Sequence, residues 1–139
     1  ALRLSNEEFD RIERIALALE RVAGFGDLPS LVGLRLVADK VGADAASAAL
    51  VLLHAGAAGS RVAAMHALIA ALGETPAFLA GGREALALGV APGVQVGRVL
   101  AAAKRLWIEA GCPAGMLAQI AFIRGAITDI TREGGLSSG

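Results

Sequence analysis

The stretch from Leu88 to Trp107, LGVAPGVQVGRVLAAAKRLW, holds residues whose types and spacing fit phosphate binding. A glycine–proline turn ends one predicted helix and starts the next, so the first N–H groups of the new helix, from Gly93 to Gly97, lack partners within the helix. Such a helix start attracts an anion. Gly97 has no side chain, so a ribose-phosphate can press against it. The basic residues that follow are Arg98, Lys104 and Arg105.

The same stretch has a second interpretation, in which its glycines serve tight packing between helices rich in small residues. Gly89, Gly93 and Gly97 then let a neighbouring helix approach closely. The turn loosely resembles a helix-hairpin-helix, which grips a nucleic-acid backbone, and spacing alone leaves both interpretations open. Under either one we expect Trp107 to be a core residue or a partly buried cover for the helix pair, and not a platform for base stacking.

The remaining reactive side chains predict no catalytic residue and no metal site. His54 and His66 fall on different predicted helices, and neither has carboxylates at the i+3 or i+4 positions that a metal site uses. Cys112 is the sole cysteine and precedes a proline at a helix end, where we expect a small packed side chain. The acidic residues Asp39, Asp44 and Glu74 do not form the closely spaced pair that holds magnesium.

The elements that must position this stretch are helices. Apolar residues recur at helical spacing between glycine and proline breaks, and no alternating strand pattern is present. We predict an all-α fold, a compact bundle of about six or seven short helices with antiparallel neighbours. The predicted helices cover 4–24, 28–42, 43–58, 60–73, 83–88, 98–110 (with its start nearer residue 93) and 114–131, and 74–82 is a loop.

Capping residues and apolar faces support these assignments. Ser5 with Glu8 matches a capping box, and Asp27 and Ser60 are the candidate caps of the second and fourth helices. The third helix is apolar nearly all round, which predicts a central position. One apolar face of the first helix is formed by Phe9, Ile12, Ala16, Leu19 and Ala23.

Length and composition fit one helical domain over residues 1–132, followed by a flexible tail at 133–139. The 139 residues begin with alanine, which is typical of a fragment of a longer chain, and 55% are hydrophobic. Thirteen basic and thirteen acidic residues cancel, which argues against tight autonomous nucleic-acid binding but not against a local basic patch. The single cysteine favours a reducing, cytoplasmic setting. No stretch predicts a membrane span or a signal peptide.

Residues 83–113, REALALGVAPGVQVGRVLAAAKRLWIEAGCP, are similar to the C-terminal helical (body and tail) region of bacterial tRNA nucleotidyltransferases, the CCA-adding enzymes, and of related poly(A) polymerases. The likeness extends over residues 2–112. Three positions depart from the family pattern: Glu84 replaces Asp, Ala85 replaces Leu, and Val94 replaces a second proline. The matching positions are Leu88, Gly89, Pro92, Gly93, Val96, Gly97, Leu100, Trp107 and Ile108.

The resemblance implies that the chain is the tRNA-binding C-terminal module of a nucleotidyltransferase. Its partners are then tRNA and an N-terminal catalytic domain of the same protein, which uses magnesium with CTP or ATP, while this chain itself holds no cofactor. The implied RNA contacts are Gly93, Gly97, Arg98, Lys104 and Arg105. Two alternatives stay open: a helical protein-interaction or dimerisation domain without nucleic-acid binding, and an independent small enzyme.

Overall fold

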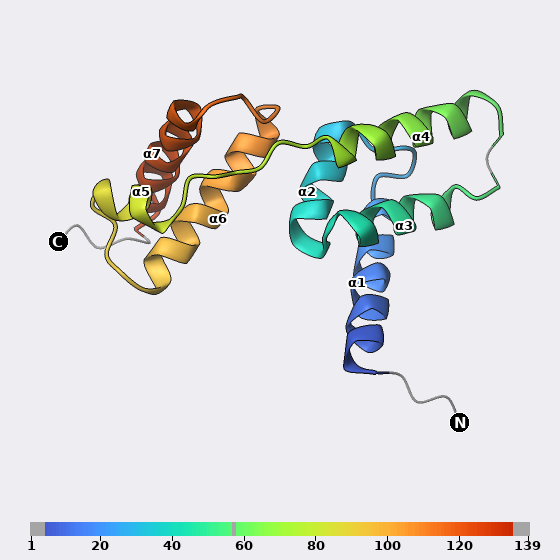
Figure 1. Cartoon of the computed structure of the whole chain (residues 1–139), viewed down its shortest axis with the longest axis horizontal. Coiled ribbons are helices and arrows are strands. Elements are labelled where there is room, and N and C mark those ends of the chain that lie inside the picture. Colours follow the sequence, from blue (N-terminus) through green and yellow to red (C-terminus); the bar gives the residue numbers. More distant parts are fainter. Residues whose placement is uncertain (1–4, 57, 135–139) are drawn as a thin grey trace. The chain divides into compact units, whose positions relative to one another are not determined.

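A computed structural model describes residues 5–56 and 58–134 (Figure 1). The all-α prediction is confirmed, because these residues form seven helices and no strand. Figure 1 shows α6 and α7 running side by side in opposite directions. Most of the tail predicted at 133–139 lies outside the described residues. The helices are α1 (Asn6–Ala23), α2 (Leu31–Val41), α3 (Ala43–Leu53), α4 (Ser60–Gly73), α5 (Gly82–Ala87), α6 (Val94–Glu109) and α7 (Met116–Arg132).

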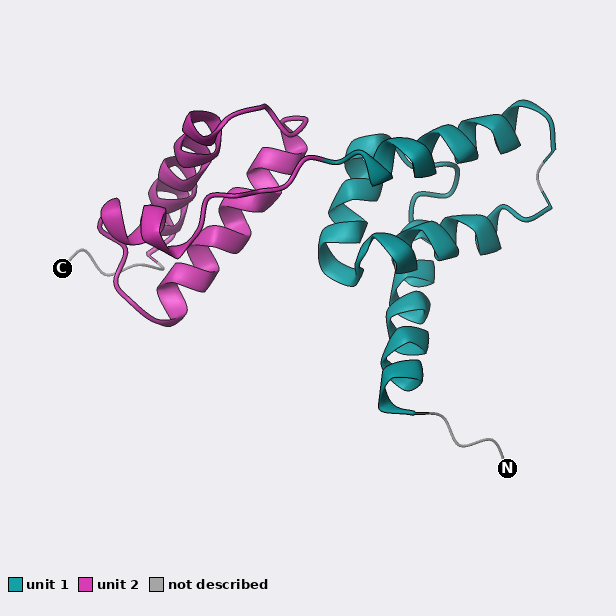
Figure 2. Ribbon diagram, in the orientation of Figure 1, with its two compact units in different colours: residues 1–75 teal, residues 76–139 magenta. Residues whose placement is uncertain are grey.

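The chain divides into two compact units, Ala1–Thr75 and Pro76–Gly139 (Figure 2). The first holds α1 to α4 and the second holds α5 to α7, and each has a buried apolar cluster of its own. The boundaries predicted from the sequence for a single helical domain, residues 1–132, remain a prediction. The phosphate-binding stretch predicted from the sequence lies within the second unit.

Serine side chains start the first two helices. The N–H of Glu8 donates to Ser5 Oγ at 3.1 Å, which confirms Ser5 as the cap of α1. The predicted cap of the second helix, Asp27, is wrong, because α2 begins after Ser30, whose Oγ accepts from Gly33 N at 3.0 Å. Pro29 explains the shift, since a proline disfavours helical geometry at the residue before it and so prevents a helix from starting at residue 28.

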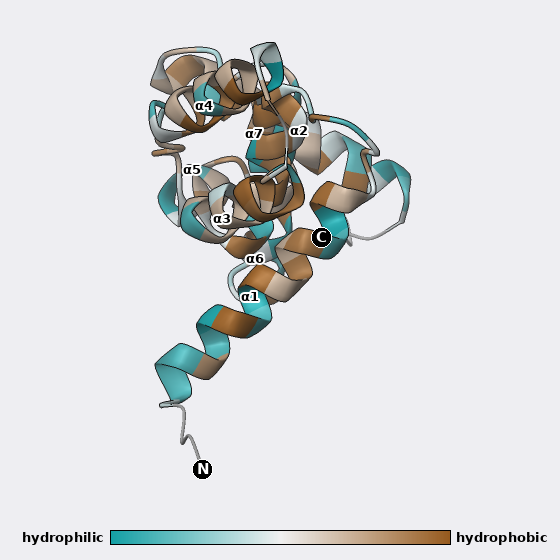
Figure 3. Ribbon diagram, turned by 90° about the vertical axis from the view of Figure 1, so that its right-hand side faces the viewer, coloured by the Kyte–Doolittle hydropathy of each residue, from teal (hydrophilic) through white to brown (hydrophobic). Residues whose placement is uncertain are grey.

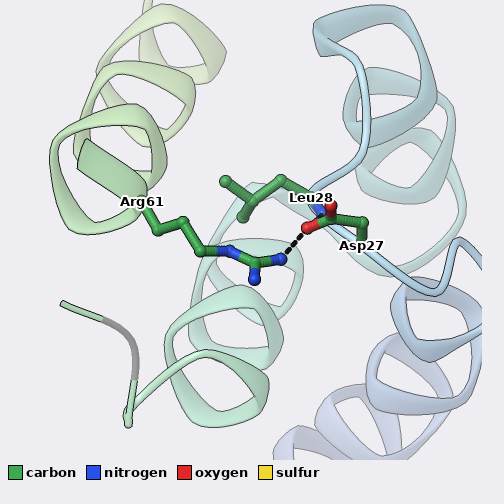
Figure 4. A network of polar contacts seen from close by, with 3 residues as sticks. All are labelled: Asp27, Leu28 and Arg61. Carbon is green, nitrogen blue, oxygen red and sulfur yellow. Dashed lines mark hydrogen bonds and ion pairs between the residues drawn. The ribbon is translucent and has the colours of Figure 1, made fainter. Parts of the chain in front are cut away.

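Asp27 instead links the α1–α2 loop to α4 (Figure 4). Its Oδ1 accepts a hydrogen bond from its neighbour Leu28 N at 2.7 Å and pairs with the guanidinium of Arg61 in the first turn of α4. Both charged side chains are more than half exposed, so water and salt screen the pair and it adds little to stability. Ser60 is the first residue of α4 and not its cap, which is Gly59 at a φ of 66°.

The first unit is held together largely by small side chains. Ala18, Ala46 and Ala49 are fully buried, and they let α1 and α3 approach closely around the larger Leu34 and Leu50. The sequence predicts the third helix over 43–58 in a central position, but α3 ends at Leu53, and the prediction of a central position is wrong for its last turn. Val51, Leu52 and Leu53 are each at least 41% exposed, where α3 runs past α1 (Figure 1).

In the second unit α6 packs against α7. The extended segment that precedes α5 is held against α7 by hydrogen bonds. Gln119 of α7 is 5% exposed, and its Oε1 accepts from Leu79 N at 2.7 Å and from Ala80 N at 2.9 Å. Its Nε2 donates to Ala77 O at 3.1 Å. One buried amide therefore satisfies three backbone groups of this segment, which fixes the approach of the chain to α5.

Candidate functional site

The turn between α5 and α6 takes its shape from two glycines with left-handed backbone geometry. Gly89 has a φ of 95° and Gly93 a φ of 103°, a region that side chains with a Cβ atom rarely adopt. A Cβ placed on Gly89, Gly93 or Gly97 would meet no atom of a neighbouring segment within 4 Å among residues 5–56 and 58–134. The interpretation in which these glycines allow tight helix packing is therefore wrong, and the turn conformation explains the first two.

The start of α6 is open to solvent. Gly93 is the N-cap residue and has no side chain with which to cap the helix, and Val96 N donates to Gly93 O at 3.1 Å. Pro92 and Gly93 are exposed and Val94 is 81% exposed. The amide end of α6 is thus reachable by an anion, but the expectation that every N–H from Gly93 to Gly97 lacks a partner is wrong for Val96, which donates to Gly93 O.

One face of α6 carries the candidate RNA contacts. Arg98 and Arg105 are seven residues apart, so they lie on the same side of the helix, separated by about 10 Å along its axis. Both are exposed, as are the small residues Gly97, which precedes Arg98, and Ala101, which lies between the two arginines. Lys104 is half-buried and lies at the edge of this surface. We call Val94, Gly97, Arg98, Ala101 and Arg105 the open face of α6.

The opposite side of α6 packs into the second unit and holds the open face outward. Its buried residues Val99, Ala103 and Trp107 recur every four residues. The Trp107 ring lies edge-on to Phe78, with ring centroids 5.2 Å apart, and Trp107 Nε1 donates to Pro113 O at 2.9 Å. Trp107 is 1% exposed, so the expectation of a core residue is confirmed.

Each of the two arginines makes a weak polar contact within α6. Arg98 Nη1 lies 3.5 Å from Gln95 Oε1, at the limit of a hydrogen bond. Arg105 Nε lies 3.7 Å from Glu109 Oε1, with both side chains about half exposed or more. Exposed pairs of this kind contribute little energy, so an incoming phosphate can replace them at small cost.

The charge of the chain is unevenly divided between its units. Residues 76–139 hold six basic and four acidic side chains, whereas residues 1–75 hold seven basic and nine acidic ones. The neutral total thus combines a net positive second unit with a net negative first unit. The open face of α6 belongs to the positive unit, which favours approach of a polyanion.

A second cationic feature lies in the first unit, in a cavity of about 400 Å³ between α1 and the start of α3. Arg11 and Arg14 line it, together with Gly42 and the carboxylate-bearing Asp44. The carboxylate offsets part of the positive charge, and both arginines are exposed. Glu109 likewise offsets part of the charge of Arg105, but the open face of α6 belongs to the net positive unit and adjoins an exposed helix start, so it is the better candidate for an anionic ligand.

The other reactive side chains are not brought together. His54 ends α3 and is half-buried, His66 is exposed on α4, and Cys112 is buried in the second unit, as expected of a packed side chain. Within the described ranges 5–56 and 58–134, no group of three His, Cys, Asp or Glu residues could hold a metal ion.

Glu84, at one of the positions where the sequence departs from the nucleotidyltransferase pattern, stabilises the start of α5. Its Oε2 accepts from Gly81 N at 2.7 Å. This hydrogen bond to the ionised carboxylate, followed by one from its own backbone N–H and by the charge of Arg83, lowers the pKa of Glu84 below its usual value. Glu84 therefore stabilises the start of α5, the helix that precedes the turn to α6, although the family pattern has Asp at this position.

Comparisons of the chain with protein-family models, with curated proteins and with solved structures found no match. The likeness to nucleotidyltransferases thus depends on the motif residues alone. Among the helices of the described chain, none has the length and apolar character that crossing a bilayer requires.

Proposed function

We propose that this chain is an RNA-binding helical module that holds the backbone of a structured RNA on the open face of α6. The proposal rests on one observation. Arg98 and Arg105 lie on the same exposed side of α6, and no side chain caps the start of this helix. The small residues Gly97 and Ala101 leave room beside the two arginines for a sugar-phosphate chain. Two guanidinium groups and the helix amides then bind phosphates, which are the most abundant contacts in such complexes.

Recognition of this kind suits double-helical RNA. A-form RNA is bound mainly through its shape, its phosphates and its 2′-hydroxyl groups, and it needs no aromatic platform. The burial of Trp107, the sole tryptophan, agrees with this mode. Because few cations take part, we expect a modest affinity that weakens as salt concentration rises.

The resemblance of residues 83–113 to nucleotidyltransferases supports a more specific role. On this proposal the RNA is tRNA, and the chain is the docking region of a cytoplasmic CCA-adding enzyme or poly(A) polymerase. The magnesium ions and the CTP or ATP then belong to a catalytic domain that precedes this region. A search for a nucleotidyltransferase domain encoded upstream of residue 1 tests this part of the proposal.

Reversing both charges of the open face is expected to weaken RNA binding strongly. In the variant Arg98→Glu/Arg105→Glu, two phosphate contacts become repulsive, so we expect the Kd for fluorescein-labelled tRNA to rise by about tenfold per residue near 0.1 M salt. Fluorescence anisotropy at several salt concentrations measures both the Kd and its salt dependence. The wild-type chain should show a negative slope of log K against log salt, and the variant a shallower one.

Two further variants give the controls for this experiment. Arg124→Glu makes the same kind of charge change on an exposed residue of α7 outside the open face and should leave the Kd within about threefold, because salt screens a single exposed charge that contacts no phosphate. Gly97→Leu adds a side chain that meets open space, so it should fold normally yet weaken RNA binding. Equal losses for Arg124→Glu and for the open-face variant would contradict the proposal.

A further inference from the structure

The first half of α1 carries an apolar stripe that its own unit does not cover. Phe9 and Ile12 are 52% and 51% exposed, and Ala16 is exposed on the same side of the helix. Figure 1 shows these turns extending beyond α2 and α3, and Figure 3 shows hydrophobic segments recurring along them. The sequence predicts one apolar face of Phe9, Ile12, Ala16, Leu19 and Ala23, and its first three members are exposed, whereas Leu19 packs against the core. We call these three residues the α1 stripe.

The α1 stripe adjoins the core of its unit. Ile15 and Leu19 lie beside it and are half-buried against the cluster that includes the fully buried Ala18 and Val22. A helix laid along the stripe would therefore continue a packed surface that already exists. Helical turns without tertiary contacts are only marginally stable in water, so a partner on this face would also fix the helix itself.

The charges beside the stripe are acidic on both sides. At 100° per residue, Glu8 falls on one flank, and Glu13 and Glu20 fall on the other. All three carboxylates are exposed. The basic residues of α1, Arg11, Arg14 and Arg21, fall farther from the stripe on the helix surface.

The carboxylates on both sides of the α1 stripe indicate which kind of partner can bind there. We infer that the α1 stripe docks an amphipathic helix of another protein whose apolar face is flanked by lysine or arginine, because such a helix pairs with Glu8, Glu13 and Glu20. A second copy of α1 would bring Glu13 and Glu20 near their own counterparts, and an anionic membrane would meet the same repulsion. The inference concerns the first unit and does not depend on RNA binding by α6.

A model peptide tests the inference with the whole chain. The probe is a fluorescein-labelled amphipathic peptide of about three heptads, with leucine at positions a and d and lysine at e and g. We expect saturable binding, measured by fluorescence anisotropy. The variant Phe9→Ser/Ile12→Ser should weaken it at least about tenfold, because it removes two large apolar contacts. The variant Glu13→Lys/Glu20→Lys should weaken it by a similar factor.

Matched controls make the result decisive. Leu17→Ser removes an exposed apolar side chain from the same helix but from a different side, and it should leave peptide binding within about twofold. Circular dichroism checks that every variant keeps its helical content. Equal binding of a peptide with glutamate at positions e and g, or no effect of Phe9→Ser/Ile12→Ser, would overturn the inference. A dimer in sedimentation that the same variant abolishes would also overturn it, since the occupant would then be a second copy.

Discussion

Replacing Gln119 with alanine is expected to lower the free energy of unfolding of the second unit by about 2–4 kcal/mol. The amide of Gln119 pairs with Ala77 O, Leu79 N and Ala80 N, and the side chain is nearly inaccessible to solvent. Its removal leaves backbone groups without partners and opens a space in the packed unit. The segment before α5 should then loosen first, because this one side chain holds it.

The sole tryptophan makes this measurement specific to the second unit. Trp107 fluorescence followed in urea reports the unfolding of residues 76–139, and comparison of the variants gives the change in stability. Gln95→Ala provides a control of the same type, since Gln95 is only partly buried and its contact with Arg98 is weak. We expect Gln95→Ala to stay within about 0.5 kcal/mol of the wild type. An equally small effect of Gln119→Ala would show that the amide does not hold the segment.

Truncating Trp107 is expected to have a still larger effect. The ring is almost fully buried, contacts Phe78 edge-on and donates a hydrogen bond to Pro113 O. Substitution of a buried aromatic residue by alanine costs about 3–5 kcal/mol, a large share of the stability of a unit this small. Thermal unfolding followed by circular dichroism should show the helices of the second unit melting at a lower temperature.

Trp107→Phe separates the two contributions of the indole. Phenylalanine keeps much of the apolar contact with Phe78 but cannot donate to Pro113 O, so we expect an intermediate loss of about 1–3 kcal/mol. If the second unit of the Trp107→Ala variant unfolded at the same temperature as that of the wild type, this result would contradict the placement of the ring in the core.

Local signals in the sequence predict most of the helices. The serine at position 5 followed by Glu8 marks the start of α1, and the glycines at 24 and 42 fall just after α1 and α2. The predicted α2 start is early by about a turn, because Asp27 has the chemistry of a cap while Pro29 decides where the helix can begin. Helix starts without a capping side chain, such as that of α6 at Gly93, are harder to place because several glycines are close together.

Contacts between distant residues have no comparable signal. Gln119 is one of several polar residues of α7, nothing in its sequence position marks it as buried, and its three partners lie about 40 positions away in the chain. The sequence likewise indicates that Phe9 and Ile12 share an apolar face, but periodicity does not say whether anything covers that face. For the same reason, the sequence predicts Lys104 as an RNA contact together with Arg98 and Arg105, whereas it lies half-buried at the edge of the open face.

The two surfaces proposed here lie in different units and differ in chemistry. The open face of α6 is cationic with small residues between its arginines, which fits a sugar-phosphate backbone. The α1 stripe is apolar with acidic flanks, which fits a basic helix. A chain with no net charge can thus have one unit suited to RNA and another suited to a protein partner.

Chemical-shift mapping of the amide resonances tests RNA binding by α6 most directly. A short double-helical RNA is titrated into the isotopically labelled chain, and perturbations are followed residue by residue. We expect the largest changes from Gly93 to Arg98 and at Ala101 and Arg105, and no change in the resonances of α1 to α4. Perturbations concentrated in the first unit, or none in α6 at saturating RNA, would contradict it.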